Sequence, residues 1–204
     1  MFELTEAQHS LWYKLILLLG IGFLIGVSAV ESHQTRKEYE QYRQESEDRI
    51  FYLNELIDNM ASSNRQANFV RRETECLAKN IYFEAAGESQ SGKIAVAEVT
   101  RNRVRDGDFP KTYCGVVYQR QDNRCAFSWT CDGQPDQVRD MKTYRESLDI
   151  ARNIVMRNKV YGVVDRDVMF YHAEYVRPYW SNKFERVKMI GQHVFYRGNN
   201  GNER

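Results

Sequence analysis

A glutamate on an apolar helical stripe is the first residue here that could do chemistry. In the stretch 76–88, C-L-A-K-N-I-Y-F-E-A-A-G-E, a helix would place Leu77, Ile81 and Glu84 on one face. A core-facing carboxylate is costly unless it is paired, protonated or placed in a cleft. Gly87 favours a helix stop, and the negative end of the helix dipole would then raise the pKa of Glu84, as a general acid requires. The alternative is a partly exposed glutamate paired with Lys79, Arg101 or Arg103.

Four cysteines form a second group of reactive side chains. All follow an N-terminal apolar segment, and an even count outside the cytoplasm favours two disulfides, with three connectivities. Cys125 and Cys131 are close in sequence and flank an aromatic loop, so we pair them, which leaves Cys76 to pair with Cys114. A zinc site is the competing interpretation. No Cys-x-x-Cys and no nearby histidine has ligand spacing, so we predict no metal and no cofactor.

A second helix is expected from about Gly92 to Arg105, with Ser89 or Ser91 as its N-cap. Its apolar residues lie all round the helix, so it should be largely buried and its polar side chains must be satisfied within the protein. These are Glu98 and Arg101, expected as an internal ion pair, and Asn102, which could point into a cleft.

The remaining segments predict an aromatic loop, a third helix and short strands. The loop, residues 125–133, is closed by Asp132-Gly133, and strand-like runs follow at 167–171 and 194–197. Residues 171–180 are polar and aromatic, residues 190–193 give a turn, and 198–204 form a loose tail. The third helix, residues 139–157, would bury Met141, Tyr144, Leu148, Ala151 and Val155.

An apolar segment, residues 11–30, precedes all of these elements. It carries one charge, Lys14, which could snorkel to the interface, and about 20 residues are enough to cross a hydrocarbon core. We expect residues 1–30 to be a cytoplasmic tip and a retained transmembrane signal-anchor. The alternatives are a buried core helix and a signal peptide cleaved near Val27-Ser28-Ala29. The flanking charges are mixed and do not settle the orientation.

Residues 31–72, which we call the stalk, are polar and contain neither Gly nor Pro. They predict a long solvated helix, with a break at residues 61–64 before the globular part. A 3-4-3 spacing links Ile50, Leu53, Ile57 and Met60, a short seam that could pair with a partner or dock on the domain. Weak self-association through the stalk is the corresponding expectation.

Composition narrows the class of function. The chain has 204 residues, enough for one domain plus an appendage, and its net charge of +1 argues against a dedicated nucleic-acid binder. Its 13 tyrosines, 3 tryptophans and 10 phenylalanines suit a carbohydrate groove, but they equally suit an ordinary core.

Several motifs in one order resemble a known family. They are N-I-Y-F-E-A-A-G-E at 80–88, G-K-I-A-V-A at 92–97, N-R-V at 102–104, F-P at 109–110, C-G-V-V-Y-Q at 114–119, F-S-W at 127–129, Y-H-A at 171–173 and V-R-P-Y-W at 176–180. This order resembles the SleB-type cell wall hydrolases, which include spore cortex-lytic enzymes and related bacterial and phage proteins. The resemblance covers about residues 75–197. It implies a mostly helical, lysozyme-like α+β domain with a small sheet or hairpin, which cuts the glycan strand of peptidoglycan with Glu84 as its acid/base.

Cleaving such a strand needs a proton donor at the leaving oxygen. Glu88 lies four residues after Glu84, but both would project to the same side of the sugar, whereas a nucleophile approaches opposite the leaving group. We therefore expect Glu88 to be structural, bonded to backbone or to Arg101. Glu84 alone would protonate the bond between N-acetylmuramic acid and N-acetylglucosamine and then deprotonate the muramic C6 hydroxyl, a lytic transglycosylase reaction that gives 1,6-anhydro ends. Muramidase hydrolysis with water is the alternative.

The resemblance also implies a cleft with two walls. Asn102 could point into it, and Arg177 could meet substrate carboxylates. The wall residues would be Phe127, Ser128 and Trp129 on one side and Tyr171, His172 and Trp180 on the other. Each aromatic taken singly could equally be core, as could His172 and His193.

These expectations combine into one arrangement of domains: 1–30 anchor, 31–72 stalk, 73–198 catalytic domain and 199–204 tail. The catalytic domain would lie outside the cytoplasm, on the periplasmic or wall side. The sequence lacks the peptidoglycan-binding repeat usual in the spore enzymes, so we expect a membrane-anchored wall hydrolase of a kind that a phage could encode for lysis or entry. A non-catalytic wall-binding or scaffold protein, and a thiol-redox protein, are the alternatives from other classes.

Overall fold

The computed structural model describes residues 6–122 and 124–198. The expected loose tail at 199–204 and the first five residues of the expected tip lie outside the described residues. Contacts divide the chain into two compact units, Met1–Ser63 and Asn64–Arg204.

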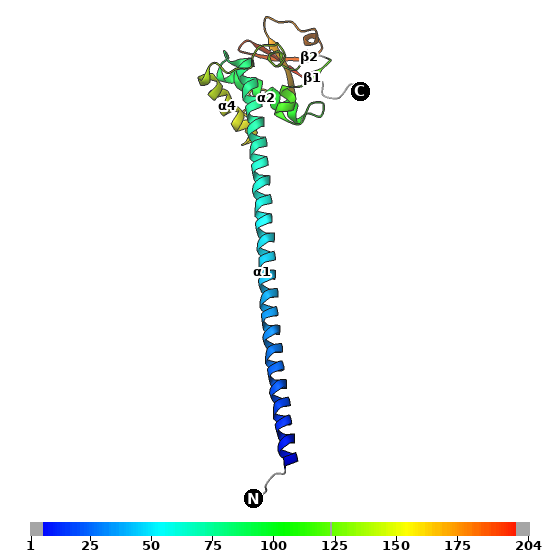
Figure 1. The fold of residues 1–204 in the computed structure, drawn as a ribbon. Helices are drawn as coiled ribbons and strands as arrows, with labels where there is room; N and C mark the ends of the chain where they lie inside the picture. Colours follow the sequence, from blue (N-terminus) through cyan, green and yellow to red (C-terminus); the bar gives the residue numbers. More distant parts are fainter. Residues whose placement is uncertain (1–5, 123, 199–204) are drawn as a thin grey trace. The chain divides into compact units, whose positions relative to one another are not determined.

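Helix α1, Glu6–Ala85, supplies all the described residues of the first unit and enters the second (Figure 1). Residues 61–64 are helical, so the predicted break in the helix is wrong, although the two units meet between Ser63 and Asn64. The large apolar side chains between Leu11 and Val30 are exposed. Within the described residues, one helix is long and apolar enough to cross a membrane, by length and composition.

The stalk part of α1 is solvated along its length. Exposed ion pairs join Arg43 to Glu40 and to Glu47, and Arg49 to Glu45. Such exposed pairs contribute at most about 1 kcal/mol each. The predicted apolar seam is also exposed at all four of its positions, Ile50, Leu53, Ile57 and Met60.

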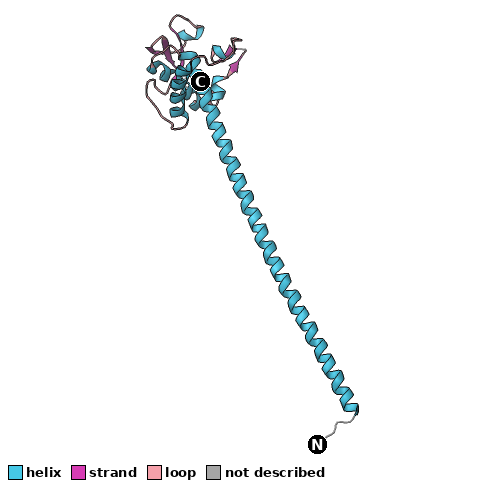
Figure 2. Cartoon of the chain, turned by 60° about the vertical axis from the view of Figure 1, so that its left-hand side comes forward, coloured by secondary structure: helices cyan, strands magenta, loops and turns pink. Residues whose placement is uncertain are grey.

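The second unit combines helices with two small antiparallel sheets, so the α+β class is confirmed (Figure 2). Its helices after α1 are α2 (Gln90–Arg105), α3 (Tyr113–Val117), α4 (Met141–Val155) and the 3-10 turns η1 (Ser128–Thr130) and η2 (Tyr179–Asn182). Strands β1 (Arg120–Gln121) and β2 (Arg124–Cys125) form a hairpin. Strands β3 (Val168–Ala173), β4 (Arg186–Ile190) and β5 (His193–Arg197) form a sheet in the order β3-β5-β4, and β4 was missed by the sequence prediction.

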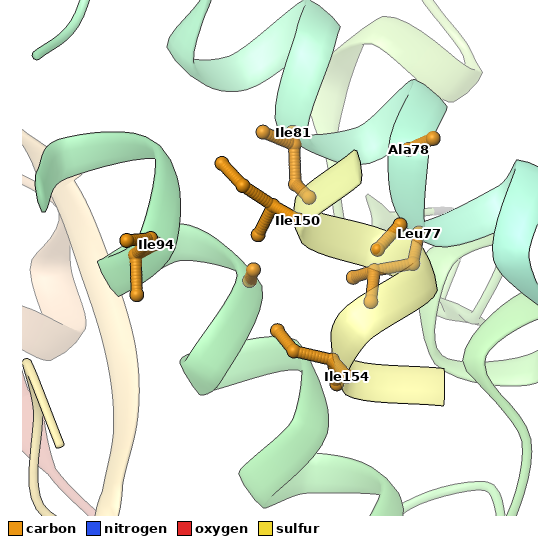
Figure 3. Packing of buried hydrophobic residues seen from close by; sticks show 8 residues of the cluster. Leu77, Ala78, Ile81, Ile94, Ile150 and Ile154 are labelled. Atoms are coloured by element: carbon orange, nitrogen blue, oxygen red, sulfur yellow. The ribbon is translucent and has the colours of Figure 1, made fainter. Parts of the chain in front are cut away.

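Helix α2 lies at the centre of this unit, as its apolar circumference predicts. Its N-cap is Ser89, whose hydroxyl accepts from the Gly92 amide. One side of α2 packs with α1 and α4, in a cluster that includes Leu77, Ile81, Ile94, Ile150 and Ile154 (Figure 3). Another side, with Ala95 and Val99, packs on β3 and β5.

Two predictions about the helices are wrong. Glu98 does not pair with Arg101: its carboxylate accepts the four backbone N–H groups of residues 161–164 at 2.8 to 3.1 Å. In α4, Met141 is exposed, whereas the predicted Ala151 is buried together with Ile150 and Ile154, which make the core contact with α1 and α2. Tyr144, Leu148 and Val155 lie at the edge of that contact.

Both predicted disulfides are present. Cys76 is bonded to Cys114, which ties the end of α1 to α3, and Cys125 is bonded to Cys131 across the aromatic loop. Among the described residues, no group of His, Cys, Asp and Glu side chains is placed to hold a metal ion.

Candidate active site

The end of α1 positions Glu84. The helix ends at Ala85, so Glu84 lies in its last turn, where the sequence predicts it. Leu77 and Ile81, on the same stripe, are completely buried in the core shared with α2 and α4. The fixed apolar part of the stripe therefore holds the carboxyl group at a defined place, and Glu84 itself remains partly exposed.

Two neighbouring groups act on the Glu84 carboxyl group. The Tyr171 hydroxyl, on β3, donates to Oε2 at 3.2 Å. Burial raises the pKa of Glu84, and the Tyr171 hydrogen bond and the charge of Arg103 oppose this rise in part. Of the three cations that the sequence offers as partners, Arg103 acts through its charge. The result is a carboxyl group held by one phenol and biased towards its protonated form.

A cavity of about 330 Å³ lies beside this pair. Tyr171 connects the pair to the cavity, because it lines the cavity and its hydroxyl donates a hydrogen bond to Glu84. Glu84 is joined to the cavity through this tyrosine. The wall consists of Arg103 from α2, Phe109, the β1–β2 hairpin with its flanking residues, two residues of β3 and two residues of η2.

Glu88 is turned towards strand β5. Its Oε1 accepts from the Gln192 amide at 3.0 Å and lies 3.3 Å from Nδ1 of His193, without the alignment of a good hydrogen bond. Its side chain is 8% exposed. Burial lowers the pKa of His193 and the nearby Glu88 carboxyl group opposes that shift, so a neutral imidazole faces the carboxyl group. Glu88 is thus bonded to backbone, the first of the two structural roles that the sequence offers, and Arg101 takes no part.

Two glycines leave room for Glu88. A Cβ atom added at Gly92 would lie 2.9 Å from Glu88 Oε2, and one added at Gly191 would overlap that oxygen. Gly191 also has φ +56°, a left-handed conformation that other residues rarely adopt. The turn between β4 and β5 is therefore built around this carboxyl group.

The predicted substrate-binding residues divide into two groups. Tyr171 and half-buried Trp180 line the cavity. Phe127 is buried against Tyr171 and Arg103, and Ser128 is exposed at the start of η1; neither is on the cavity wall.

Three of the predicted residues have structural roles instead. Trp129 is 7% exposed, stacks on Phe83 and donates from Nε1 to Asn80. Asn102 is 4% exposed, and its amide donates to the carbonyls of Asp165 and Val168. His172 is bonded at both ring nitrogens, to the Ala173 carbonyl and to the Tyr196 hydroxyl. Hydrogen bonds within the protein take up the Trp129 indole N–H, the Asn102 NH₂ group and both ring nitrogens of His172, so these groups are not available to a substrate.

Sequence reasoning missed much of the cavity wall. Arg103 follows Asn102 in a helix whose apolar residues lie all round it, and a charged side chain there is a signal of a buried role. Single local patterns do not identify the other missed lining residues, because they come from separate segments: Gln119, Gln121, Arg124, Phe170 and Tyr179.

Comparison with known proteins adds an independent finding. Residues 87–196, more than half of the chain, match the family model described as Cell Wall Hydrolase. The chain belongs to the cell wall hydrolase family. Glu84 precedes the matched span by three residues, so its role is argued from the geometry of the site.

Curated relatives of this wall hydrolase include the spore cortex-lytic enzymes of Bacillus subtilis strain 168 and Oceanobacillus iheyensis. They are 26% and 27% identical to it over 136 residues, which is 66% of this chain. The chain spans 40% and 45% of the lengths of these relatives, less than half in each case.

Two solved structures are also similar. The catalytic domain of the Bacillus cereus SleB protein is 25% identical, with a TM-score of 0.46, over 62% of this chain and 91% of that chain. The catalytic domain of the germination-specific lytic transglycosylase SleB from Bacillus anthracis is 26% identical, with a TM-score of 0.47, over 61% and 93%.

Proposed function

We propose that this wall hydrolase cuts the glycan strand of peptidoglycan between N-acetylmuramic acid and N-acetylglucosamine, as a lytic transglycosylase with Glu84 as its acid/base. The observation that carries the proposal is the pairing of Glu84 with Tyr171 beside the cavity. The carboxyl group has a raised pKa, a single phenol as its hydrogen-bond partner and no second carboxyl group bonded to either residue in the described part of the chain.

The reaction needs one group that first gives and then takes a proton. Protonated Glu84 gives its proton to the glycosidic oxygen, and the bond from that oxygen to C1 breaks. The resulting carboxylate takes the proton of the C6 hydroxyl, whose oxygen bonds to C1. Glu84 ends protonated, no water is consumed, and the muramic residue carries a 1,6-anhydro ring.

Tyr171 orients the carboxyl group for both steps. Its hydroxyl occupies Oε2, which leaves Oε1 to carry the proton. When Glu84 is ionised, the same hydrogen bond stabilises the carboxylate. Glu88, the next acidic residue along the chain, is engaged by Gln192 and His193, so we assign no nucleophile to it.

Aromatic side chains on the cavity wall would hold the sugars. Trp180 and Tyr179 on η2 and Phe170 on β3 offer ring surface beside Tyr171. Ring faces of this kind pack on the apolar faces of sugars, and the two glutamines of the wall supply hydrogen bonds.

We further propose that residues 11–30 anchor the enzyme in a membrane, with the catalytic unit on the periplasmic or wall side. The exposed apolar side chains of that segment support this, since water would not favour so many together. Disulfides persist in oxidising compartments, and all four cysteines are paired. Origin in a phage, weak self-association through the stalk and the domain boundaries at 30, 72 and 198 remain part of this proposal.

Product analysis tests the proposed reaction. The full chain in detergent micelles should clear purified sacculi and release anhydro-muropeptides, identified by mass spectrometry, and Glu84→Gln should not. A matched control is Glu75→Gln, an exposed glutamate on the same helix that pairs with Arg71. If all products carry reducing ends, the enzyme is a muramidase and not a lytic transglycosylase. Binding to sacculi without turnover, unchanged in Glu84→Gln, would show a wall-binding protein instead.

A further inference from the structure

A buried arginine on the cavity wall has N–H donors that make no hydrogen bond to the described residues. Arg103 is 7% exposed and lines the cavity. Its Nε donates to the Met169 carbonyl at 2.7 Å, and among the described residues its two Nη groups have no hydrogen-bond acceptor. A buried guanidinium in this position is costly unless something satisfies it.

Three aromatic rings surround this guanidinium, and the Glu84 carboxyl group acts on it through charge without a hydrogen bond. Its carbon lies 5.3 to 5.5 Å from the ring centroids of Phe109, Phe127 and Phe170. These rings hold the charge in place by cation–π contact, but they accept no N–H bond in the way an anion does. The guanidinium is therefore held in place with its two Nη groups available to a ligand.

A second arginine lines the same cavity from the hairpin. Nη1 of Arg124 donates to the Tyr179 hydroxyl at 3.1 Å, and the guanidinium lies 5.8 Å from the centroid of that ring. Asp122 competes for it weakly, with Oδ2 at 3.8 Å from Nη2 and both side chains mostly exposed. The hydrogen bond to Tyr179 orients Arg124, and an incoming anion could replace Asp122 as its ion-pair partner.

The wall as a whole is cationic. It carries these two arginines and no acidic residue among the described residues that line it, together with two glutamines and the rings of Phe170 and Trp180. Guanidinium groups bind planar carboxylates through paired N–H bonds. This combination is suited to a sugar that carries a carboxylate.

We propose that Arg103 and Arg124 form an anion subsite that takes a carboxylate carried by the muramyl residue of the glycan strand. The inference rests on the proposed function, because it names the substrate group that the cavity recognises. The carboxylate comes either from the lactyl ether of that residue or from a stem peptide attached to it; the chemistry at the arginines is the same. The subsite makes the enzyme prefer carboxylated glycan to neutral glycan.

Binding without turnover tests the subsite. The full chain carrying Glu84→Gln, in detergent micelles, is titrated by calorimetry with a soluble muramyl glycan fragment and with the same fragment whose lactyl carboxyl group has been coupled to methylamine. We expect the amidated fragment to bind about tenfold more weakly, the loss of one charge-assisted contact at a partly open site. Adding Arg124→Gln should weaken binding of the carboxylate about tenfold and leave the amide unchanged, which removes the preference.

Arg152→Gln is the matched control. Arg152 is also an exposed arginine in a loose ion pair, with Asp149 at 3.5 Å, and it lies on α4 outside the cavity wall. Its substitution should leave the preference intact. Arg103→Lys, which keeps the charge but loses the planar fork, should reduce the preference, and circular dichroism checks that it folds. Equal binding of carboxylate and amide before any arginine is changed, or a preference that survives Arg124→Gln, would overturn the subsite.

A third ligand identifies the source of the carboxylate. A fragment with its stem peptide attached has no free lactyl carboxylate. Charge-dependent binding of this fragment, lost in Arg124→Gln, assigns the subsite to the peptide; its absence, with the preference for the free lactyl form retained, assigns it to the lactyl group. Turnover of sacculi by the wild-type chain is measured separately, so failure of the proposed reaction and failure of the subsite are distinct results.

Discussion

Two glutamates of this enzyme are withdrawn from water in very different surroundings. Glu98, at the centre of α2, is 2% exposed and its carboxylate accepts four backbone N–H groups. Glu84, at the end of α1, is partly exposed and has one hydrogen bond, from Tyr171. The more deeply buried carboxylate is therefore the better satisfied one.

The difference separates a structural carboxylate from the acid/base that we propose. Four backbone donors satisfy the side-chain oxygens of Glu98 and tie the segment 161–164 to α2. One donor leaves Glu84 with a raised pKa and a free oxygen, as general acid chemistry needs. Depth of burial alone would have selected Glu98 rather than the glutamate that we propose as acid/base.

Exchanging Glu84 for glutamine should have the largest effect on activity. Glutamine keeps the shape and the Tyr171 contact but has no proton to give, so we expect turnover of sacculi to fall about 10³-fold. Thermal unfolding should stay close to that of the wild-type chain. Residual activity within tenfold of wild type would remove Glu84 from the mechanism.

The same exchange at Glu98 should act on stability. An amide offers one acceptor oxygen and turns an NH₂ group towards backbone donors, so we expect a loss of about 3 kcal/mol in the free energy of unfolding. Denaturant titration followed by near-UV circular dichroism measures it. Glu185→Gln, which loses only an exposed pair with Arg197, is the control and should cost under about 1 kcal/mol. If Glu98→Gln unfolds with the same free energy as the wild-type chain, Glu98 does not have the structural role that separates it from Glu84.

Tyr171→Phe should change both the rate and the pH profile. The hydrogen bond from Tyr171 lowers the pKa of Glu84, so its removal raises that pKa further. Because Glu84 must be protonated to act, the alkaline limb of kcat/KM should move to higher pH. Loss of orientation should reduce kcat about tenfold. An alkaline limb that moves to lower pH would contradict this role for the phenol.

A smaller effect should appear in the pH dependence of stability. Burial raises the pKa of Glu84 in the folded chain, so its contribution is fully present below the unfolded pKa of about 4.3 and is lost as pH rises through the folded pKa. Glu84→Gln removes this titration. The variant should therefore gain stability relative to wild type as pH rises through that window, measured by unfolding at matched pH values. A difference that is constant with pH would mean that burial does not perturb this carboxyl group.

Local patterns predicted the parts of the fold that depend on neighbouring residues. Gly87 indicated the end of α1, which falls at Ala85, and the Ser89 cap indicated the start of α2. The short alternation in Arg186–Ile190 was too brief to indicate β4. The buried face of α4 was predicted in part: Ala151 lies in the core, but Ile150 and Ile154 lie beside the predicted stripe, and contact with α1 and α2 buries them.

The site shows the same limit. The sequence identified Glu84 because an acidic residue is unexpected on an apolar helical stripe. Trp129 and Trp180 both belong to aromatic motifs, yet one stacks in the core and the other lines the cavity, and tertiary packing decides between them. The arginines of the cavity, Arg103 and Arg124, come from α2 and from the hairpin, so their convergence appears only in three dimensions.

The close packing of Gly92 and Gly191 against Glu88 restricts which residues homologous chains can have at these positions. Any side chain at Gly191 would collide with Glu88 Oε2, and the left-handed backbone there disfavours other residues even without that oxygen. In homologous chains that keep an acidic residue at the position of Glu88, the position of Gly191 should therefore remain glycine. Aligned sequences that keep the acid but vary the glycine freely would show that the turn is more adaptable than its packing indicates.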